Sequence, residues 1–375
     1  MHKNDDNNFK QDITELVKKH GTPLFLISKS NLKKRVEYFR KLLPGIMPYY
    51  AVKANPSLDV LKTFADMGLC FDVASEKEID TVLSLDVSPD SLILANSVKS
   101  PFLVKFAREK KVSLLTFDSE YELQKIAKHA PGSRVIARIK VPNVGSVVEL
   151  SLKFGLEPED VMPLLIKAKK LKLKPEGISF HVGSQCTRVE NYLEAFELTS
   201  MILRDAETKN IPMNIVDIGG GFPIEHFNHE KKVFEEMVPV LNGEIDRIFN
   251  KSVRIIGEPG RTLVGPCCTL VMRIIGKSIR KNKHWYYLDD GVYGCLSGII
   301  YDHCKYQFNV FKKGPVQIST LAGPTCDSFD IISVSEDLPE LEIGDIIYVK
   351  NIGAYSIATA TNFNSIPIAK IIPVE

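Results

Sequence analysis

One lysine follows a short apolar run near the start of the chain. Residues 49–52 read Tyr-Tyr-Ala-Val, and Lys53 comes next, before Ala-Asn-Pro. A lysine at the end of a strand often covers apolar surface with its stem and leaves its ammonium in water. Alternatively, burial lowers the pKa of the amine, so that the neutral form can attack a carbonyl and form a Schiff base. The rest of the sequence must decide between these two interpretations.

Two later segments have the composition of an anion site. They are "DIGGGFP" (residues 217–223) and "GEPGRTL" (residues 257–263). Consecutive glycines let backbone N–H groups surround a phosphate, and the Arg261 guanidinium adds a fork of donors. Glu258 lies three residues before that arginine. A cofactor with an aldehyde, a phosphate and a basic ring nitrogen would use the lysine, the cradle and the acid, which predicts pyridoxal 5'-phosphate (PLP).

The elements that must position these residues are short β-rich runs that alternate with helical patterns. The runs read "YYAVKA", "LCFDVAS", "SLILANS", "VSLLTFDS", "VIARIKV", "GISFHVGS", "NIVDIGGG" and "VRIIGEPG". Alternating strands and helices favour a parallel sheet, and eight units are typical of a (β/α)₈ barrel. An open doubly wound sheet is the alternative.

Nearly every predicted strand ends on a polar residue. In a (β/α)₈ barrel the chemistry lies at the carboxyl ends of the strands. Helix capping could explain one or two of these residues, such as Ser75 and Asp118, but not all of them. An ordinary buried core residue is the other interpretation of His181. The strand-end residues are Lys53, Asp72, Ser75, Asn96, Asp118, Arg138, His181, Ser184, Asp217, Glu258 and Arg261.

After about residue 263 the pattern becomes strands and turns with little helix, as in "CCTLVMRIIGKSI" and "DIIYVKNIGAYSIA". We therefore predict a second, all-β domain, a small barrel or sandwich. The expected boundaries are residues 25–265 for the PLP-binding barrel, and residues 1–24 with 266–375 for the β domain.

The bulk composition excludes several classes of protein. The 375 residues are 44% hydrophobic and 25% charged, with a formal net charge of only +2. Without a basic tract, nucleic acid and anionic membranes are poor partners. The polar start lacks the apolar core of a signal peptide, and no run is long enough to span a bilayer. Seven cysteines without a C-x-x-C pair indicate a reducing, cytoplasmic compartment and no metal site.

The motifs together resemble a known family, the PLP-dependent decarboxylases with the alanine-racemase-like fold, and among these the ornithine decarboxylases. The resemblance covers essentially the whole chain. It rests on "YYAVKAN", "SFHVGSQC", "DIGGGFP", "EPGR", "DDGVYG", "YDH", "CDSFD" and "GAYS", which occur in the order typical of the family.

The resemblance implies a role for each matching position. Lys53 would carry PLP, Glu258 would pair with the pyridine nitrogen, and His181 would stack on the ring. Cys326 would act as a proton donor near the substrate. Asp72 and Arg138 would support the site. The phosphate would be bound or its loops shaped by Ser184, Gly220, Gly221, Gly260, Arg261 and Tyr355. The substrate would contact Tyr301, Asp302, Asp327 and Phe363.

The implied reaction is decarboxylation of L-ornithine to putrescine and CO₂, in polyamine biosynthesis, with L-lysine to cadaverine as a possible second activity. Two acids suit a cationic amino acid. The family forms homodimers with shared active sites. Gln185 departs from many ornithine enzymes and leaves carboxynorspermidine or diaminopimelate decarboxylation open as alternatives. A racemase lacks the acidic pair. A non-catalytic sequestering relative loses cofactor residues, whereas Lys53, Glu258, Arg261 and Cys326 are all present here.

Overall fold

The computed structural model describes residues 3–142, 146, 153–225 and 233–375. The chain divides into two compact units. The barrel unit comprises Leu32–Glu225 and Lys231–Leu263, and the β unit comprises Met1–Asn31, His226–Glu230 and Val264–Glu375. Each unit is described by itself below.

The barrel unit is built on a closed ring of eight parallel strands in sequence order, which confirms the predicted (β/α)₈ barrel and all eight predicted runs. The ring closes because β2 also pairs with the last strand, β9. Its strands are β2 (Ile46–Ala51), β3 (Cys70–Val73), β4 (Leu92–Leu94), β5 (Leu114–Phe117), β6 (Arg134–Arg138), β7 (Lys174–Ser179), β8 (Ile215–Asp217) and β9 (Arg254–Gly257).

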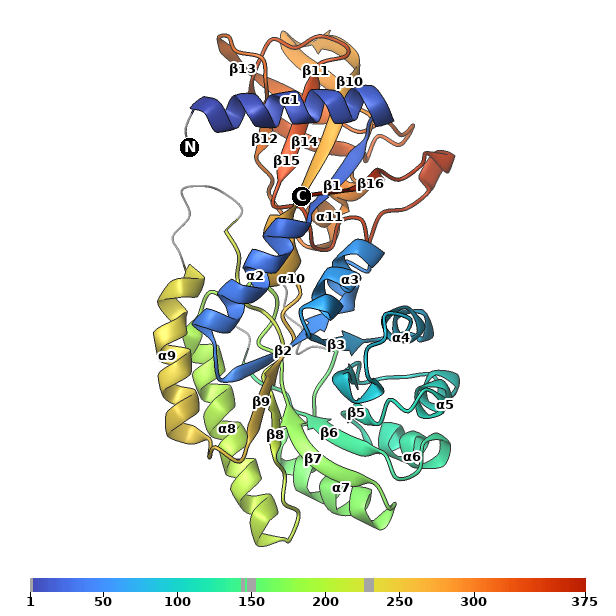
Figure 1. The fold of residues 1–375 in the computed structure, drawn as a ribbon, viewed down its shortest axis with the longest axis vertical. Helices are drawn as coiled ribbons and strands as arrows, with labels where there is room; N and C mark the ends of the chain where they lie inside the picture. Colours follow the sequence, from blue (N-terminus) through green and yellow to red (C-terminus); the bar gives the residue numbers. More distant parts are fainter. Residues whose placement is uncertain (1–2, 143–145, 147–152, 226–232) are drawn as a thin grey trace. The chain divides into compact units, whose positions relative to one another are not determined.

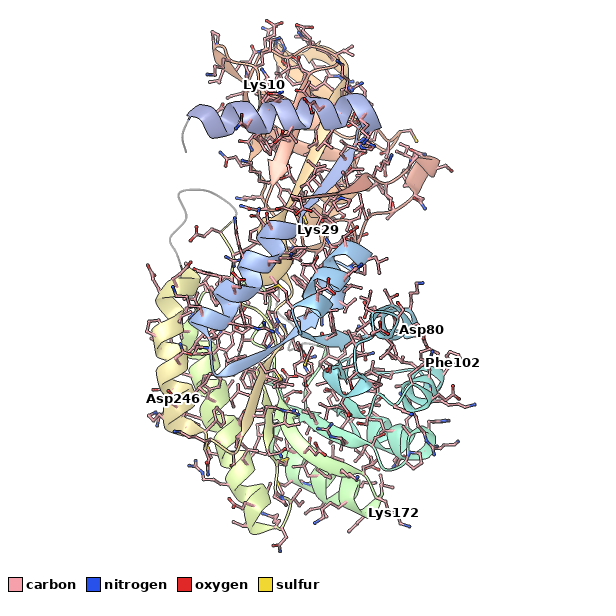
Figure 2. All side chains as sticks on the ribbon, in the orientation of Figure 1. Lys10, Lys29, Asp80, Phe102, Lys172 and Asp246 are labelled. Atoms are coloured by element: carbon pink, nitrogen blue, oxygen red, sulfur yellow. The ribbon has the colours of Figure 1, made fainter. Side chains whose placement is uncertain are left out.

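Helices lie outside this ring (Figure 1). They are α2 (Lys29–Leu42), α3 (Leu58–Asp66), α4 (Glu76–Leu83), α5 (Pro101–Glu109), α6 (Glu120–His129), α7 (Pro158–Lys170), α8 (Val189–Thr208) and α9 (Val233–Ile248). Two short 3₁₀ turns, η1 (Val52–Ala54) and η2 (Pro89–Ser91), and the short helix α10 (Arg261–Val264) complete the connections. Charged side chains such as Asp80, Lys172 and Asp246 point outward from this layer (Figure 2).

Serine side chains start several of the barrel helices. Ser75, Ser100 and Ser119 accept hydrogen bonds from the backbone N–H groups of Glu78, Leu103 and Glu122. Each bond satisfies a donor at a helix start that has no partner within the helix. Ser75 is therefore a cap, as the sequence allowed. Asp118 is not, because Ser119 caps α6 and the Asp118 carboxylate accepts from the N–H of Gly155.

The β unit holds a mixed sheet in the order β12-β15-β10-β11-β13-β14, and β1 pairs with both β10 and β16. Its strands are β1 (Leu24–Ser28), β10 (Cys268–Arg280), β11 (Lys283–Leu288), β12 (Phe308–Val310), β13 (Val316–Ala322), β14 (Ile331–Pro339), β15 (Ile346–Lys350) and β16 (Lys370–Val374). The 3₁₀ turns η3 (Gly265–Cys267), η4 (Cys295–Ser297) and η5 (Phe363–Ser365) connect them.

This unit is mostly β, as expected, but it also contains helices α1 (Lys3–His20) and α11 (Gly298–Tyr301). Helix α1 was not predicted, because the first residues of the chain are polar. Its apolar residues Phe9, Ile13, Leu16 and Val17 recur at helical spacing and pack in one cluster with Leu24, Leu26 and Val271. We expected the barrel domain to begin at residue 25, whereas β1 lies in the sheet of the β unit.

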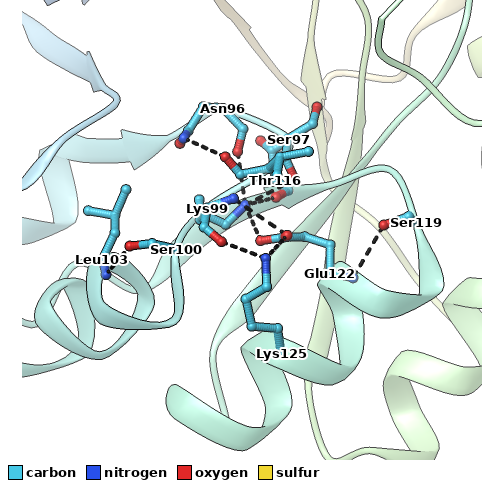
Figure 3. Close-up of polar contacts among 10 residues, drawn as sticks. Asn96, Ser97, Lys99, Ser100, Leu103, Thr116, Ser119, Glu122 and Lys125 are labelled. Atoms are coloured by element: carbon cyan, nitrogen blue, oxygen red, sulfur yellow. Dashed lines mark hydrogen bonds and ion pairs between the residues drawn. The ribbon is translucent and has the colours of Figure 1, made fainter.

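A buried ion cluster joins two neighbouring strands of the barrel (Figure 3). The Lys99 ammonium lies 3.0 Å from Glu122 Oε1, and both side chains are almost completely buried. It also donates to the backbone oxygens of Asn96 and Thr116, at 2.9 and 2.5 Å. Lys125 pairs with the same glutamate. The cluster therefore ties the segment after β4 to the end of β5.

No helix among the described residues is both long enough and apolar enough to cross a membrane.

Candidate active site

The carboxyl end of the barrel presents an accessible amine held by a carboxylate. β2 ends at Ala51, and Lys53 lies in the 3₁₀ turn that follows. Its Nζ donates to Oδ2 of Asp72 at 2.7 Å. The lysine side chain is 47% exposed, whereas the Asp72 side chain is 1% exposed. The simpler interpretation of Lys53, a stem on apolar surface with its charge in water, is therefore incomplete, because the ammonium has a buried acidic partner.

Two more carboxyl groups interact at the same end of the barrel. Asp217 ends β8, is fully buried, and accepts from the N–H of Gly219 at 2.9 Å. Burial raises the pKa of Asp217 to about 6, and the Glu258 carboxyl donates a hydrogen bond to it. Burial, followed by the negative charges of Asp217 and Asp72, raises the pKa of Glu258 well above its ordinary value. Both pKa values rise for the same physical reason, since two buried carboxyl groups interact.

His181 presents a neutral imidazole. Its Nδ1 accepts from the backbone N–H of Gly183 at 3.0 Å, so the ring proton of the neutral form lies on Nε2. Burial, followed by the positive charges of Arg138 and Lys53, lowers the pKa of His181 well below its usual value. The interpretation of His181 as an ordinary core histidine is not favoured, because it lies among the charged residues of the barrel end and keeps some exposure.

The glycine-rich segment after β8 has no room for side chains. An added Cβ at Gly221 would lie 2.3 Å from the backbone oxygen of Gly183, and one at Gly220 would lie 2.8 Å from the backbone oxygen of Glu258. Gly219 and Gly221 have φ values of +65° and +93°, which glycine adopts without strain. The backbone of this segment is therefore held against the loops that follow β7 and β9.

The remaining barrel residues of the predicted site lie on the same strand ends. Ser184 follows Gly183 in the loop after β7. Arg138 is the last residue of β6, and its guanidinium lies 5.1 Å from the ring centre of Phe154. Gly260 precedes Arg261, which is 6% exposed and begins α10.

A second group of predicted residues lies in the β unit. Tyr293 Oη donates to Asp327 Oδ2 at 2.5 Å, and its ring stacks on Phe363 with 4.4 Å between centroids. The Tyr293 hydrogen bond, followed by one from the N–H of Phe329, lowers the pKa of Asp327. The Cys326 N–H donates to Oδ1 of Asn364 at 3.1 Å, and the cysteine itself is exposed. These contacts fix the Cys-Asp segment.

The other three predicted residues of the β unit are Tyr301, Asp302 and Tyr355. Tyr301 is 65% exposed at the end of α11, and Asp302, which follows it, is 9% exposed. Cys304 Sγ lies 3.5 Å from Asp302 Oδ2. Tyr355 has a positive φ of 52°.

Three residues with evident roles in this geometry were missed or not selected from the sequence. Asp217 lies at a predicted strand end, but its interaction with Glu258 depends on two strands meeting in space. Tyr293 lies inside the quoted "DDGVYG" motif, and that motif was the one available signal. Asn364 had no signal, because its contact to Cys326 joins residues 38 positions apart. Among the described residues, no group of three His, Cys, Asp or Glu side chains could hold a metal ion.

Comparison with known proteins gives a consistent result. Residues 29–265 match the family model for "Pyridoxal-dependent decarboxylase, pyridoxal binding domain". The chain is 37% identical to the lysine/ornithine decarboxylase of Selenomonas ruminantium, over 98% of this chain and 93% of that protein. It is 38% identical to antizyme inhibitor 2 of Xenopus laevis, over 87% of this chain and 75% of that protein. The crystal structure of SrLDC in complex with PLP and cadaverine is 36% identical, has a TM-score of 0.92, and matches over 97% of this chain and 93% of that one.

The donor set of the barrel fits PLP. Lys53 supplies an accessible amine, Glu258 a buried carboxyl, His181 a flat neutral ring, and the glycine segment a backbone free of side chains. With the family model matching more than half of the chain, this protein belongs to the pyridoxal-dependent decarboxylase family, and its cofactor is pyridoxal 5'-phosphate.

Proposed function

We propose that the protein decarboxylates L-ornithine to putrescine and CO₂, and L-lysine to cadaverine as a second activity. The observation that carries this proposal is the fixed position of the Asp327 carboxylate. Tyr293 donates a hydrogen bond to it, and the Tyr293 ring stacks on Phe363. A carboxylate held ionised next to an aromatic surface suits an ammonium at the end of an aliphatic chain. The lysine/ornithine relative supports the same class of substrate.

The barrel residues would hold the cofactor. Lys53 would carry it through its amine, with Asp72 orienting that amine. His181 would lie against the ring, and the Glu258 carboxyl would pair with the ring nitrogen, beside Asp217. Arg138 would add positive charge beside them. The phosphate would be bound by Ser184, Gly221, Arg261 and Tyr355, on loops shaped by Gly220 and Gly260.

PLP, when bound, supplies an electron sink for the pair of electrons left by departing CO₂. The protein's own contribution is proton placement. Paired with the ring nitrogen, the Glu258 carboxylate would hold a proton on that nitrogen, and the exposed Cys326 would donate a proton to the α-carbon. The low pKa of His181 keeps its ring neutral, so it adds no competing charge.

The substrate's far end would meet residues of the β unit. Asp327 and Asp302 would bind the distal ammonium, while Tyr301 and Phe363 would line the aliphatic stem. Ornithine and lysine differ by one methylene, which a pocket distinguishes by only about 1–3 kcal/mol. Turnover of both substrates is therefore expected.

We further propose a homodimer in which Cys326 and Asp327 complete the site of the partner subunit. The test is to mix two inactive variants, Lys53→Ala and Cys326→Ala. If sites are shared, mixed dimers contain one intact site, and activity returns. Sedimentation of the wild type as a monomer, or no activity on mixing, would contradict this arrangement. A cytoplasmic location is proposed with it, because all seven cysteines are free thiols.

Two other functions are distinguishable from this one. Carboxynorspermidine or diaminopimelate decarboxylation is favoured only by Gln185. A sequestering role, which similarity to antizyme inhibitor 2 raises, is not favoured by the Lys53–Asp72 pair, because a protein without catalysis has no need of an oriented amine.

The deciding experiment measures CO₂ release from L-ornithine, L-lysine, L-arginine and meso-diaminopimelate with added PLP. Turnover of ornithine and lysine is expected. Asp327→Asn should raise KM for both roughly tenfold or more, with less effect on kcat, because the neutral amide loses the charge that binds the ammonium. Release from diaminopimelate alone would overturn the proposed substrate. Release from none of the four would turn the search to carboxynorspermidine and then to sequestration.

A further inference from the structure

Gln185 lies in the loop after β7 with a strained backbone. Its φ is +51°, in the left-handed region where a side chain other than glycine or asparagine is uncommon. A glycine at this position would adopt the same conformation without strain. The chain has glutamine instead, so the side chain must offset the strain through its contacts.

The Gln185 amide makes two hydrogen bonds with one residue of the neighbouring loop. Its Nε2 donates to the Ile224 oxygen at 3.1 Å, and its Oε1 accepts from the Ile224 N–H at 2.9 Å. Ile224 is 9% exposed. Because buried backbone groups need partners, the amide satisfies both the donor and the acceptor of this residue.

These two bonds extend a contact between the loops after β7 and β8. The Cys186 N–H donates to the Gly221 oxygen at 2.8 Å, and a Cβ at Gly221 would clash with the Gly183 oxygen. Tyr192, on α8, donates from Oη to the Gly220 oxygen at 2.8 Å. The Gln185 side chain therefore connects Ile224, at the C-terminal end of the glycine segment, to the loop that carries Ser184.

We propose that Gln185 is a positioning residue for the cofactor phosphate. It sets the spacing between the loop of Ser184 and the loop of Gly221, two sides of the phosphate cradle. This inference rests on the cradle assigned under the proposed function. A cradle built from backbone N–H groups binds a phosphate well only when those groups are held in place beforehand, since ordering them on binding would weaken affinity.

The test compares PLP with pyridoxal, which lacks the phosphate, in equilibrium titrations of the cofactor-stripped full chain. The variant is Gln185→Gly, which removes the amide and also removes the backbone strain. PLP affinity should fall about tenfold to a hundredfold, the effect of losing one or two hydrogen bonds. Pyridoxal affinity should change less than about twofold, because it does not use the cradle.

Lys172→Gly is the matched control. Lys172 also has a positive φ, +60°, in an exposed turn after α7, so its replacement relieves the same kind of strain outside the site. It should leave both affinities unchanged. If Gln185→Gly does not fold, Gln185→Met keeps the side-chain length, lacks the amide hydrogen bonds, and should show the same selective loss of PLP affinity.

The outcomes separate this inference from the proposed function. Unchanged PLP affinity in Gln185→Gly, or equal loss of PLP and pyridoxal affinity, would overturn the role of Gln185. The proposed cradle would still stand if the wild type bound PLP much more tightly than pyridoxal. If the wild type bound PLP and pyridoxal equally, the cradle itself would be overturned, and the role of Gln185 with it.

Discussion

Lys53 and Lys99 follow strands β2 and β4 of one barrel, and each has a carboxylate within 3.0 Å. Their surroundings are opposite. The Lys53 side chain is 47% exposed, whereas the Lys99 side chain is 0% exposed and donates to backbone oxygens as well as pairing with Glu122. A buried lysine with all its donors engaged stabilises a fold, and an accessible lysine held by one oriented acid is available for chemistry. Burial of an amine alone therefore does not identify a reactive lysine.

The electrostatics of Lys99 fit its structural role. Burial lowers its pKa to about 8, and Glu122 acts in the opposite direction to keep the ammonium charged. Lys125 and the backbone N–H of Lys99 also contact Glu122, so the carboxylate is shared within the cluster. Such a cluster specifies how the segment after β4 meets β5.

The largest expected effect is on catalysis, where replacing Lys53 should lower activity and replacing Lys99 should not. Lys53→Ala should lower kcat/KM by roughly a thousandfold or more, because no other group supplies the amine. Its stability should change less than that of Lys99→Met, because the Lys53 ammonium is accessible to water and the Lys99 ammonium is not. Lys99→Met should keep the activity of each folded molecule. The measurement is CO₂ release normalised to folded protein, and high residual activity in Lys53→Ala would refute the assignment.

The second prediction concerns stability. Lys99→Met should lower the free energy of unfolding by about 3–5 kcal/mol, since it leaves Glu122 and buried backbone oxygens without the ammonium. Urea titration followed by circular dichroism measures this. Lys105→Met, at an exposed ion pair on α5, is the control and should change stability by less than about 1 kcal/mol. Equal effects of the two variants would show that the cluster is not structural.

The third prediction concerns the pH dependence of stability, which tests whether the Lys99 ammonium is desolvated. Lys99 has a pKa of about 8 in the folded protein and its ordinary 10.5 when unfolded. Between these values the unfolded state binds more protons, so the wild type gains stability as pH rises, by roughly 3 kcal/mol in total. The stability difference between wild type and Lys99→Met should therefore widen from pH 7.5 to 10. A flat difference would mean that the ammonium is not desolvated.

The last prediction, which has the smallest expected effect, compares the carboxylates of Asp72 and Glu122. Asp72→Asn should lower kcat/KM about tenfold to a hundredfold, the usual value of one charge-assisted hydrogen bond, with little change in unfolding. Glu122→Gln should do the reverse, lowering stability while leaving kcat/KM near that of the wild type. Steady-state kinetics and urea titration on both variants decide. Loss of activity in Glu122→Gln at full folding would contradict the separation of roles.

The barrel and its cofactor were predictable from the sequence for identifiable reasons. Apolar runs such as "SLLTF" must be buried on both faces, and alternation with helical patterns leaves few arrangements besides a parallel barrel. The carboxyl ends of parallel strands meet at one edge, so the strand positions of Lys53, His181 and Glu258 are enough to group them. Helix α1 was missed because its polar first residues concealed an apolar stripe that begins only at Phe9.

The residue types at the strand ends, the family motifs and the glycines where no Cβ fits can all be recognised in the sequence. Which charges are buried, and which groups form a hydrogen bond, depends on the folded arrangement. Asp217 and Glu258 are 41 positions apart, and Gln185 and Ile224 are 39 apart. The pKa of a group and the strength of its contacts depend on distance and desolvation, which arise only when separate strands and loops pack together.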